Sequence, residues 1–375
     1  KMKSLRYTAA AVIALLMAAC TSKDELPTYI VDESAVTTGS EKLSDHVSSI
    51  KIVPLETSDS LLIGRISGIR KDGDRLFVNA DNHLMQFDMN GKFVKEIARI
   101  GAGPGELKRI NNFDVEGDSC YILSFDKLVI KSISNPGSYR EVPVRSGNYI
   151  RFTPDGMLVA CGMPLENGNV IVQLDEKGDT IRTMLKACDD WNLSKVVGLP
   201  ELSDGTYIQQ MNFSNDLALV TPRTGEVRNI KLINTSEALD NDELNDALRQ
   251  SNSKMDVAGE MYTGITVSGS HIFWISMSRG EMNLYIYDKE RQDAVKLNFN
   301  NLVDDISGAD NFMNNMMIGT LPFNESDDNS FISVIDPAVA SAYIKENPNS
   351  FAAEYAPLDN ADDDANPAVI FINFK

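Results

Sequence analysis

Short apolar runs separated by turn residues make up most of the chain after residue 45. Within residues 75–97, the runs Leu76–Val78, Leu84–Phe87 and Phe93–Ile97 are interrupted by clusters of Asp, Asn and Gly. Strands bounded by these turn formers are the signature of β-hairpins. The pattern therefore predicts a meander of short antiparallel strands.

The same arrangement recurs along the chain. Its copies hold about four strands each and recur at intervals of roughly 40 to 65 residues; they begin near Arg75, Ser119, Gly156, Gly205 and Ser270. A single small sheet exposes both apolar faces, whereas neighbours in a ring cover them. The repeat predicts an all-β fold, a six-bladed β-propeller of four-stranded antiparallel blades with the sixth blade in the C-terminal part. A pair of β-sandwiches is the alternative, but sandwiches seldom repeat one turn formula so regularly.

The two ends of the repeat region are expected to close the ring. Ser49–Leu55 precedes the first full copy and is predicted to pair with the last blade, near the apolar run Ala368–Phe374. The innermost strands are expected near Ile66–Ile69, Ile110–Phe113, Tyr149–Phe152, Gly198–Glu201, Gly264–Val267 and Met316–Gly319.

Two longer segments late in the chain interrupt the strand pattern. Asn234–Asn252 has apolar residues at partly helical spacing, and Asp336-Pro337 is a suitable N-cap and first turn for a helix through Lys345. Both are predicted to be short helical insertions on the rim.

Arg99–Leu107 concentrates three glycines and a proline. We interpret it as the crossover from the outer strand of one blade to the inner strand of the next, where a sharp turn needs positive φ angles. A phosphate-binding loop is the alternative, but the segment lacks the Lys and Ser/Thr of a P-loop and no helix pattern follows it.

The N-terminal residues have the pattern of an export signal. Lys3 and Arg6 precede the apolar run Ala9–Met17, which is shorter than the ~20 residues that span a bilayer. Ala18-Ala19-Cys20 resembles the lipobox of bacterial lipoproteins, which implies acylation of Cys20 and anchoring through lipid. An ordinary secretory signal with an incidental cysteine is the alternative.

The expected organisation is a signal peptide over residues 1–19, a lipidated tether over 20–44 and a single six-bladed propeller domain over 45–375. Thr21–Glu25 resembles the export tag of surface lipoproteins in the Bacteroidetes. This resemblance implies an outer-membrane lipoprotein exposed at the cell surface; the alternative orientation faces the periplasm.

Charge and cysteine content narrow the function classes. The chain has 54 acidic and 35 basic residues and a net charge of −19, which disfavours binding to nucleic acid. Lipidation of Cys20 would leave Cys120, Cys161 and Cys188. A disulfide between Cys161 and Cys188 and three separate buried thiols both stay open.

The meander places the loops between second and third strands on the same face as the crossovers between blades. Because loops converge at such a mouth, we expect a ligand site there. The candidate ligand-binding residues are Asn82, His83, Arg99, Glu106, Asp126, Glu166, Asn212 and Arg279. Ordinary solvated turn residues are the competing interpretation for most of them.

Catalytic chemistry is less well supported. The chain has only three histidines, and no Gly-x-Ser-x-Gly motif is present. A calcium ion would need several carboxylates and amides around the axis, and Asn111, Asn112, Asp126 and Glu201 are the residues available. No catalytic residue is assigned, no cofactor is expected, and calcium stays open.

Residues from about Ile50 to Leu107 and the ending DDDANPAVIFINFK resemble the six-bladed β-propeller lipoproteins of gut Bacteroidetes, relatives of the NHL-repeat propellers. The resemblance implies the fold and the cell-envelope location. The sequence thus predicts a membrane-anchored binding or scaffolding module for a protein, peptide or glycan partner. The alternative is a calcium-assisted hydrolase or lyase with its site at the propeller mouth.

Overall fold

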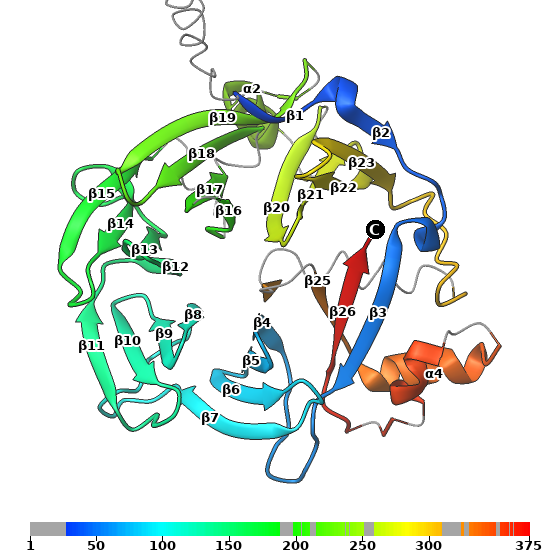
Figure 1. The fold of residues 1–375 in the computed structure, drawn as a ribbon, viewed down its shortest axis with the longest axis horizontal. Coiled ribbons are helices and arrows are strands. Elements are labelled where there is room, and N and C mark those ends of the chain that lie inside the picture. Colours follow the sequence, from blue (N-terminus) through cyan, green and yellow to red (C-terminus); the bar gives the residue numbers. More distant parts are fainter. Residues whose placement is uncertain are drawn as a thin grey trace, which may run out of the picture.

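The computed structural model describes residues 28–187, 198–203, 205–210, 215–236, 238–239, 241–250, 259–309, 324–325, 330–349, 353–359, 361–362 and 364–375. Six sheets stand around a central axis, in chain order around the ring (Figure 1). The predicted six-bladed β-propeller is confirmed.

Five blades are meanders in which consecutive strands pair from the axis outward. Blade 1 contains β4 (Ile66–Asp72), β5 (Arg75–Ala80), β6 (His83–Asp88) and β7 (Phe93–Arg99), and blade 2 contains β8 (Asn112–Glu116), β9 (Ser119–Leu123), β10 (Lys127–Ser132) and β11 (Tyr139–Pro143). Blade 3 contains β12 (Gly147–Thr153), β13 (Gly156–Cys161), β14 (Asn169–Leu174) and β15 (Thr180–Lys186). Blade 4 contains β16 (Glu201–Ser203), β17 (Thr206–Gln210), β18 (Asp216–Thr221) and β19 (Glu226–Asn234), and blade 5 contains β20 (Met261–Ser268), β21 (His271–Ser278), β22 (Glu281–Asp288) and β23 (Asp293–Asn298).

The sixth blade joins the two ends of the repeat region. Its described strands are β25 (Ser330–Ile335), β26 (Ala368–Phe374) and β3 (Val47–Pro54), in that order from the axis. β26 pairs antiparallel with β3, with Ile370 opposite Ile52, so the predicted closure is confirmed. The expected inner strand at Met316–Gly319 lies outside the described residues.

Apolar side chains fill the spaces between blades. One buried cluster lies at each of the six interfaces, because the strands send alternate side chains to the neighbour on either side. Between blades 1 and 2, for example, Phe77 packs with Phe113 and Ile122. Strands buried on both faces need nearly continuous apolar runs, which is the pattern read from the sequence.

A belt of chain covers outer edges of the ring. β1 (Tyr29–Asp32) pairs parallel with β19, and β2 (Val36–Thr38) pairs parallel with β23; both follow the rim in Figure 1. The folded part therefore begins by Tyr29 and not at residue 45 as expected for a tether of residues 20–44. An outer strand has unpaired backbone N–H and C=O groups, and a further strand can form hydrogen bonds with them. The local sequence of residues 29–38 does not show that they pair in this way.

An aspartate at the end of the third strand recurs in three blades. The side chain of Asp88 accepts hydrogen bonds from the backbone N–H groups of Asn90 and Lys92. Asp175 and Asp288 make the equivalent bonds to the turns that follow them. The repeated turn formula thus serves to hold the hairpin between third and fourth strands.

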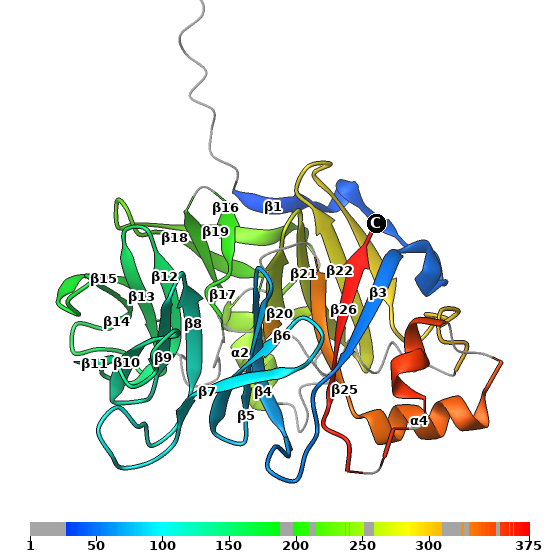
Figure 2. The same cartoon turned by 60° about the horizontal axis from the view of Figure 1, so that its bottom comes forward.

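The predicted helical insertions are present as α2 (Asn241–Gln250) and α4 (Pro337–Glu346). Asp336 caps α4, accepting hydrogen bonds from the N–H groups of Ala338 and Val339. Figures 1 and 2 show α4 on the outer side of the sixth blade, away from the central axis. Among the described helices, none has the length and apolar character required to cross a bilayer.

The glycine-rich loop after β7 is a crossover, as predicted. Its turn is closed by Glu106, whose carboxylate accepts the N–H of Gly103 at 2.8 Å and pairs with Arg99 Nε at 3.4 Å. The hydrogen bond from Gly103 is the main cause of the lowered pKa of Glu106. Gly105 has φ +73°, a conformation that favours glycine.

The strand order defines two faces of the ring. The crossover face carries the loops between second and third strands and the crossovers between blades, including residues 100–111. The turn face carries the other hairpin turns, including Gly117-Asp118, and the C-terminal Lys375 beside His46.

Candidate functional site: an axial cavity on the turn face

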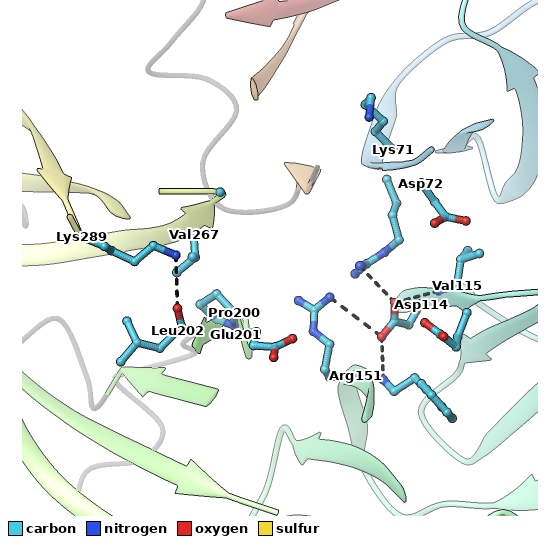
Figure 3. Close-up of a pocket in the computed structure, with 14 residues that line it drawn as sticks. Lys71, Asp72, Asp114, Val115, Arg151, Pro200, Glu201, Leu202, Val267 and Lys289 are labelled. Carbon is cyan, nitrogen blue, oxygen red and sulfur yellow. Dashed lines mark hydrogen bonds and ion pairs between the residues drawn. The ribbon is translucent and has the colours of Figure 1, made fainter. Parts of the chain in front are cut away.

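The inner strands end around a cavity of about 440 Å³ on the turn face. It is lined by residues at or just beyond the ends of β4, β8, β12, β16 and β20 and by Lys289 from the outer part of blade 5. In Figure 3, Glu201 and Lys289 approach this space from one side and Lys71 and Asp72 from the other. Five blades therefore contribute to one hollow on the axis.

Equivalent positions of three successive inner strands carry charges of alternating sign. Arg70, Asp114 and Arg151 each lie opposite the third residue of the second strand of their own blade. This register brings the three side chains together at the same depth in the ring.

Asp114 is the centre of a network that joins these blades. Arg70 Nη1 lies 3.0 Å from Asp114 Oδ1, and Arg151 Nη1 lies 3.9 Å from Oδ2; the Arg151 guanidinium points toward Asp114 in Figure 3. The Asp114 side chain is only 4% exposed. A carboxylate so removed from water is tolerated only when its charge is paired and its oxygens are hydrogen-bonded.

Backbone groups complete the pairing. The N–H of Val115 donates to Asp114 Oδ1 at 2.7 Å, and that of Phe152, in the next blade, donates to Oδ2 at 2.6 Å. Arg151 Nε donates to the carbonyl oxygen of Leu199 at 3.1 Å. The network thereby spans the inner ends of blades 1 to 4 and holds the charged wall of the cavity in place.

The far wall carries one further group of each sign. Lys289 Nζ donates to the carbonyl oxygen of Leu202 at 3.2 Å. Burial lowers the pKa of Lys289, while the nearby Glu201 carboxylate acts in the opposite direction. Glu201 also lies close enough to Tyr207 to add to the effect of burial, which raises the pKa of that phenol.

A short strand lies on the axial side of blade 1. β24 (Asn324–Glu325) pairs parallel with β4, with Asn324 opposite Ile69 and Glu325 opposite Arg70. Backbone from late in the chain therefore reaches the axis beside Arg70, Asp114 and Arg151.

Residues 28–373 match the family model described as a domain of unknown function, DUF4934. The chain belongs to this family. A Bacteroides fragilis protein described as a candidate exported protein has the same fold, with a TM-score of 0.73 at 16% identity over 92% of this chain and 99% of that one.

Two further solved structures match with lower TM-scores. A Saccharomyces cerevisiae complex of Dbp5 with Nup159 and Gle1 gives a TM-score of 0.41 at 8% identity, covering 81% of this chain and 76% of that chain. The extracellular domain of a candidate one-component system from Bacteroides thetaiotaomicron gives 0.40 at 10% identity, covering 66% and 29%. No curated protein shows a significant match to the sequence.

In this DUF4934 propeller, those ligand-binding residues expected from sequence that the structure describes lie on the crossover face, away from the axial cavity. Four of them are in ion pairs: Arg99 and Glu106 with each other, Asp126 with Lys108 at 3.4 Å, and Glu166 with Arg145 at 2.8 Å. Asn82 and Arg279 occupy turn positions with φ of 66° and 48°. His83 lies beside Glu96, with Nδ1 3.4 Å from Oε1, and Asn212 lies outside the described residues.

The four residues considered for calcium do not converge. Asn111 Nδ2 donates to the carbonyl oxygen of Gly147, and Asn112 Oδ1 accepts the N–H of Ile150. Asp126 is on the crossover face and Glu201 is at the axial cavity. Within the described ranges, no group of three or more His, Cys, Asp or Glu side chains could hold a metal ion.

The two cysteines that the structure describes are buried free thiols. Cys120 is inaccessible and Cys161 is 2% exposed, and burial raises the pKa of Cys161 to about 11. Cys188, its suggested partner, lies outside the described residues.

Of the axial residues, Glu201 was considered in the sequence for calcium, whereas Arg70, Asp114 and Arg151 were missed although a signal for them exists. Arg70 and Asp114 directly follow predicted inner strands and Arg151 lies inside one, where an apolar residue would be expected. Charges at the same register of three repeats indicate a shared polar position, but only the ring places these residues next to one another.

Proposed function

We propose that this propeller is a lipid-anchored binding module of the cell envelope, which holds a polar group of a protein, peptide or glycan partner in the axial cavity. The observation that carries the proposal is the cavity itself, with charges of both signs fixed around it. Its volume falls within the usual range of ligand sites, about 300–1,000 Å³.

The rigidity of the site supports binding. The Arg70–Asp114–Arg151 network is anchored by backbone groups of three blades, so little side-chain ordering has to accompany binding. Lys289 and Glu201 on the far wall add a donor and an acceptor. These two side chains can therefore bind a ligand group that carries both hydrogen-bond donors and acceptors.

The envelope location rests on the N-terminal pattern. Cys20 follows an apolar run and small residues in the manner of a lipoprotein signal, and a protein of the same fold is described as a candidate exported protein. Fatty-acid labelling of the expressed chain tests this part: we expect label in the wild type and none in Cys20→Ser. Equal labelling of both would contradict it.

The binding function is tested by recovering partners from envelope fractions with the lipidated chain. We expect a partner captured by the wild type to be lost in Glu201→Gln/Lys289→Gln, whereas the control Glu176→Gln, exposed on a turn of blade 3, retains it. Unchanged capture by the double variant, or no partner with any chain, would refute the axial site.

A further inference from the structure

A second cavity, of about 330 Å³, opens on the crossover face beside blade 1. The segment 56–62 forms one wall, and β5, β6 and β7 form the other. Leu61, Met85 and Phe93 contribute apolar surface to the lining. Leu62, also in the lining, is 65% exposed, so apolar surface continues from the cavity to the protein surface.

The lining of this cavity carries three carboxylates and one histidine, and His83 Nδ1 lies 3.4 Å from Glu96 Oε1. Glu56, Asp81 and Glu96 line it together with His83, and no Lys or Arg of the described chain is among the lining residues. Arg99 lies opposite His83 in the sheet, but its guanidinium pairs with Glu106 on the crossover loop. Lys131, which is not among the lining residues, interacts electrostatically with both Glu106 and Glu96.

Two of the carboxylates are fixed by backbone groups. Asp81 accepts the N–H groups of Gly64 and Arg65, at 2.5 and 3.2 Å. Glu56 Oε2 accepts the N–H of Phe93 at 2.9 Å. These bonds orient the negative groups without neutralising their charge.

We infer that this cavity receives a lysine or arginine side chain of a partner polypeptide. Such a side chain combines an apolar stem with a cationic end, and the cavity combines apolar walls with carboxylates. Phe93, Met85 and Leu61 would contact the methylenes, while Glu96 and Asp81 would receive the cation. An anion or a purely apolar group would leave the carboxylates opposed or buried without a partner.

This site is independent of the axial cavity, because it lies on the other face of the ring and shares no lining residue with it. Loss of binding at one site therefore leaves the other as a control. A partner that binds the crossover face must therefore present an exposed basic residue beside an apolar surface that covers Leu62.

The test uses the full chain and two short peptides, acetyl-Gly-Lys-Gly-amide and its norleucine counterpart, which keeps the stem but lacks the charge. NMR titration should show saturable binding of the lysine peptide and weaker binding of the norleucine peptide. Glu96→Gln should weaken binding of the lysine peptide by about fivefold, as for loss of one partly exposed charge partner. The control Glu176→Gln should leave it unchanged.

Several results would overturn the inference. Equal binding of both peptides would show that charge is not recognised, and an unaltered affinity in Glu96→Gln would place the cation elsewhere. Absence of saturable binding by either peptide to the folded wild type would also refute the site. Thermal unfolding of each variant shows whether the fold is intact. Leu62→Ser provides a second variant, which removes an apolar contact without changing a residue of the sheet.

Discussion

At the scale of single residues, the inner strands show how polar groups are placed in an apolar fold. Asp114 lies in a strand whose neighbours are buried, yet its two oxygens receive two backbone N–H groups and face two guanidinium groups. Removing Asp114 takes away the carboxylate that both guanidinium groups face, and buried charge that has lost its counter-charge costs more than the intact network contributes.

Replacement of Asp114 by Ala is therefore expected to lower the free energy of unfolding by about 3 kcal/mol or more. Urea unfolding followed by tryptophan fluorescence measures the change. Asp126→Ala is the matched control, because Asp126 is 53% exposed in its pair with Lys108 and should cost less than ~1 kcal/mol. Similar losses in the two variants would contradict the structural role of the network.

At the scale of elements, the ring closure depends on more than strand pairing. Asn366, just before β26 and 2% exposed, ties the C-terminal segment to residues 56–63. Its Oδ1 accepts the N–H of Ile63 at 2.6 Å, and its Nδ2 donates to the carbonyl oxygens of Glu56 and Leu61 at 2.6 and 2.8 Å. Asn366, within the ending DDDANPAVIFINFK, thus ties the last blade to the segment that leads into the first.

Asn366→Ala should lower the free energy of unfolding by about 2–3 kcal/mol, because the buried N–H of Ile63 and the partly buried carbonyl oxygens of Glu56 and Leu61 lose their partner. Asn300→Ala, in an exposed turn, is the control and should be close to neutral. Chemical denaturation measures the free energy of unfolding of both variants and of the wild type. A neutral Asn366→Ala would mean that water replaces the carboxamide at no cost.

The attachment of β1 to β19 is expected to weaken at low pH. Hydrogen bonds from the side chain and N–H of Ser34 and from Asn234 lower the pKa of Asp32 to about 2. Because the folded-state pKa lies below the ordinary value of about 3.9, the carboxylate stabilises the belt above pH ~4, and this contribution is lost as pH falls toward 2.

Hydrogen exchange of β1 amides should therefore accelerate between pH ~4 and ~2 after correction for intrinsic exchange. In Asp32→Asn this pH dependence should be absent, since the amide does not titrate. A variant that keeps the full acid response would assign it to other carboxylates.

At the scale of the whole molecule, the central strand of the sixth blade closes the ring. β26 pairs with both β25 and β3, and Val369, Ile370 and Ile372 are inaccessible. Without β26, the first and last segments of the propeller have no common sheet, and two apolar interfaces become exposed.

Truncation after Pro367 should abolish the cooperative thermal transition seen by calorimetry or circular dichroism. Removal of Lys375 alone, whose N–H bonds the carbonyl oxygen of His46, is the control and should keep a cooperative transition. A truncated chain that unfolds cooperatively would show that the remaining blades are stable as an open array.

Much of this architecture could be predicted because its determinants are local and repeated. Asp88, Asp175 and Asp288 recur before the turn between the third and fourth strands. Apolar runs near Phe77, Ile122 and Leu158 recur as the second strands, so the number of strands follows from counting. The belt could not be predicted, since Tyr29–Asp32 is short and its pairing partner Lys231 is some 200 residues away. Pairing across such a separation leaves no trace in local periodicity.

The sequence by itself determined the blades, their order, the closure by Ser49–Leu55 and the caps of the late helix, because alternation, turn residues and N-caps act over a few positions. Only the tertiary structure decided which residues meet at the axis. Arg70, Asp114 and Arg151 are about 40 residues apart along the chain, and they become neighbours only when the blades stand in a circle. Spatial convergence of distant positions, which sets the cavity and its charges, is a property of the closed ring.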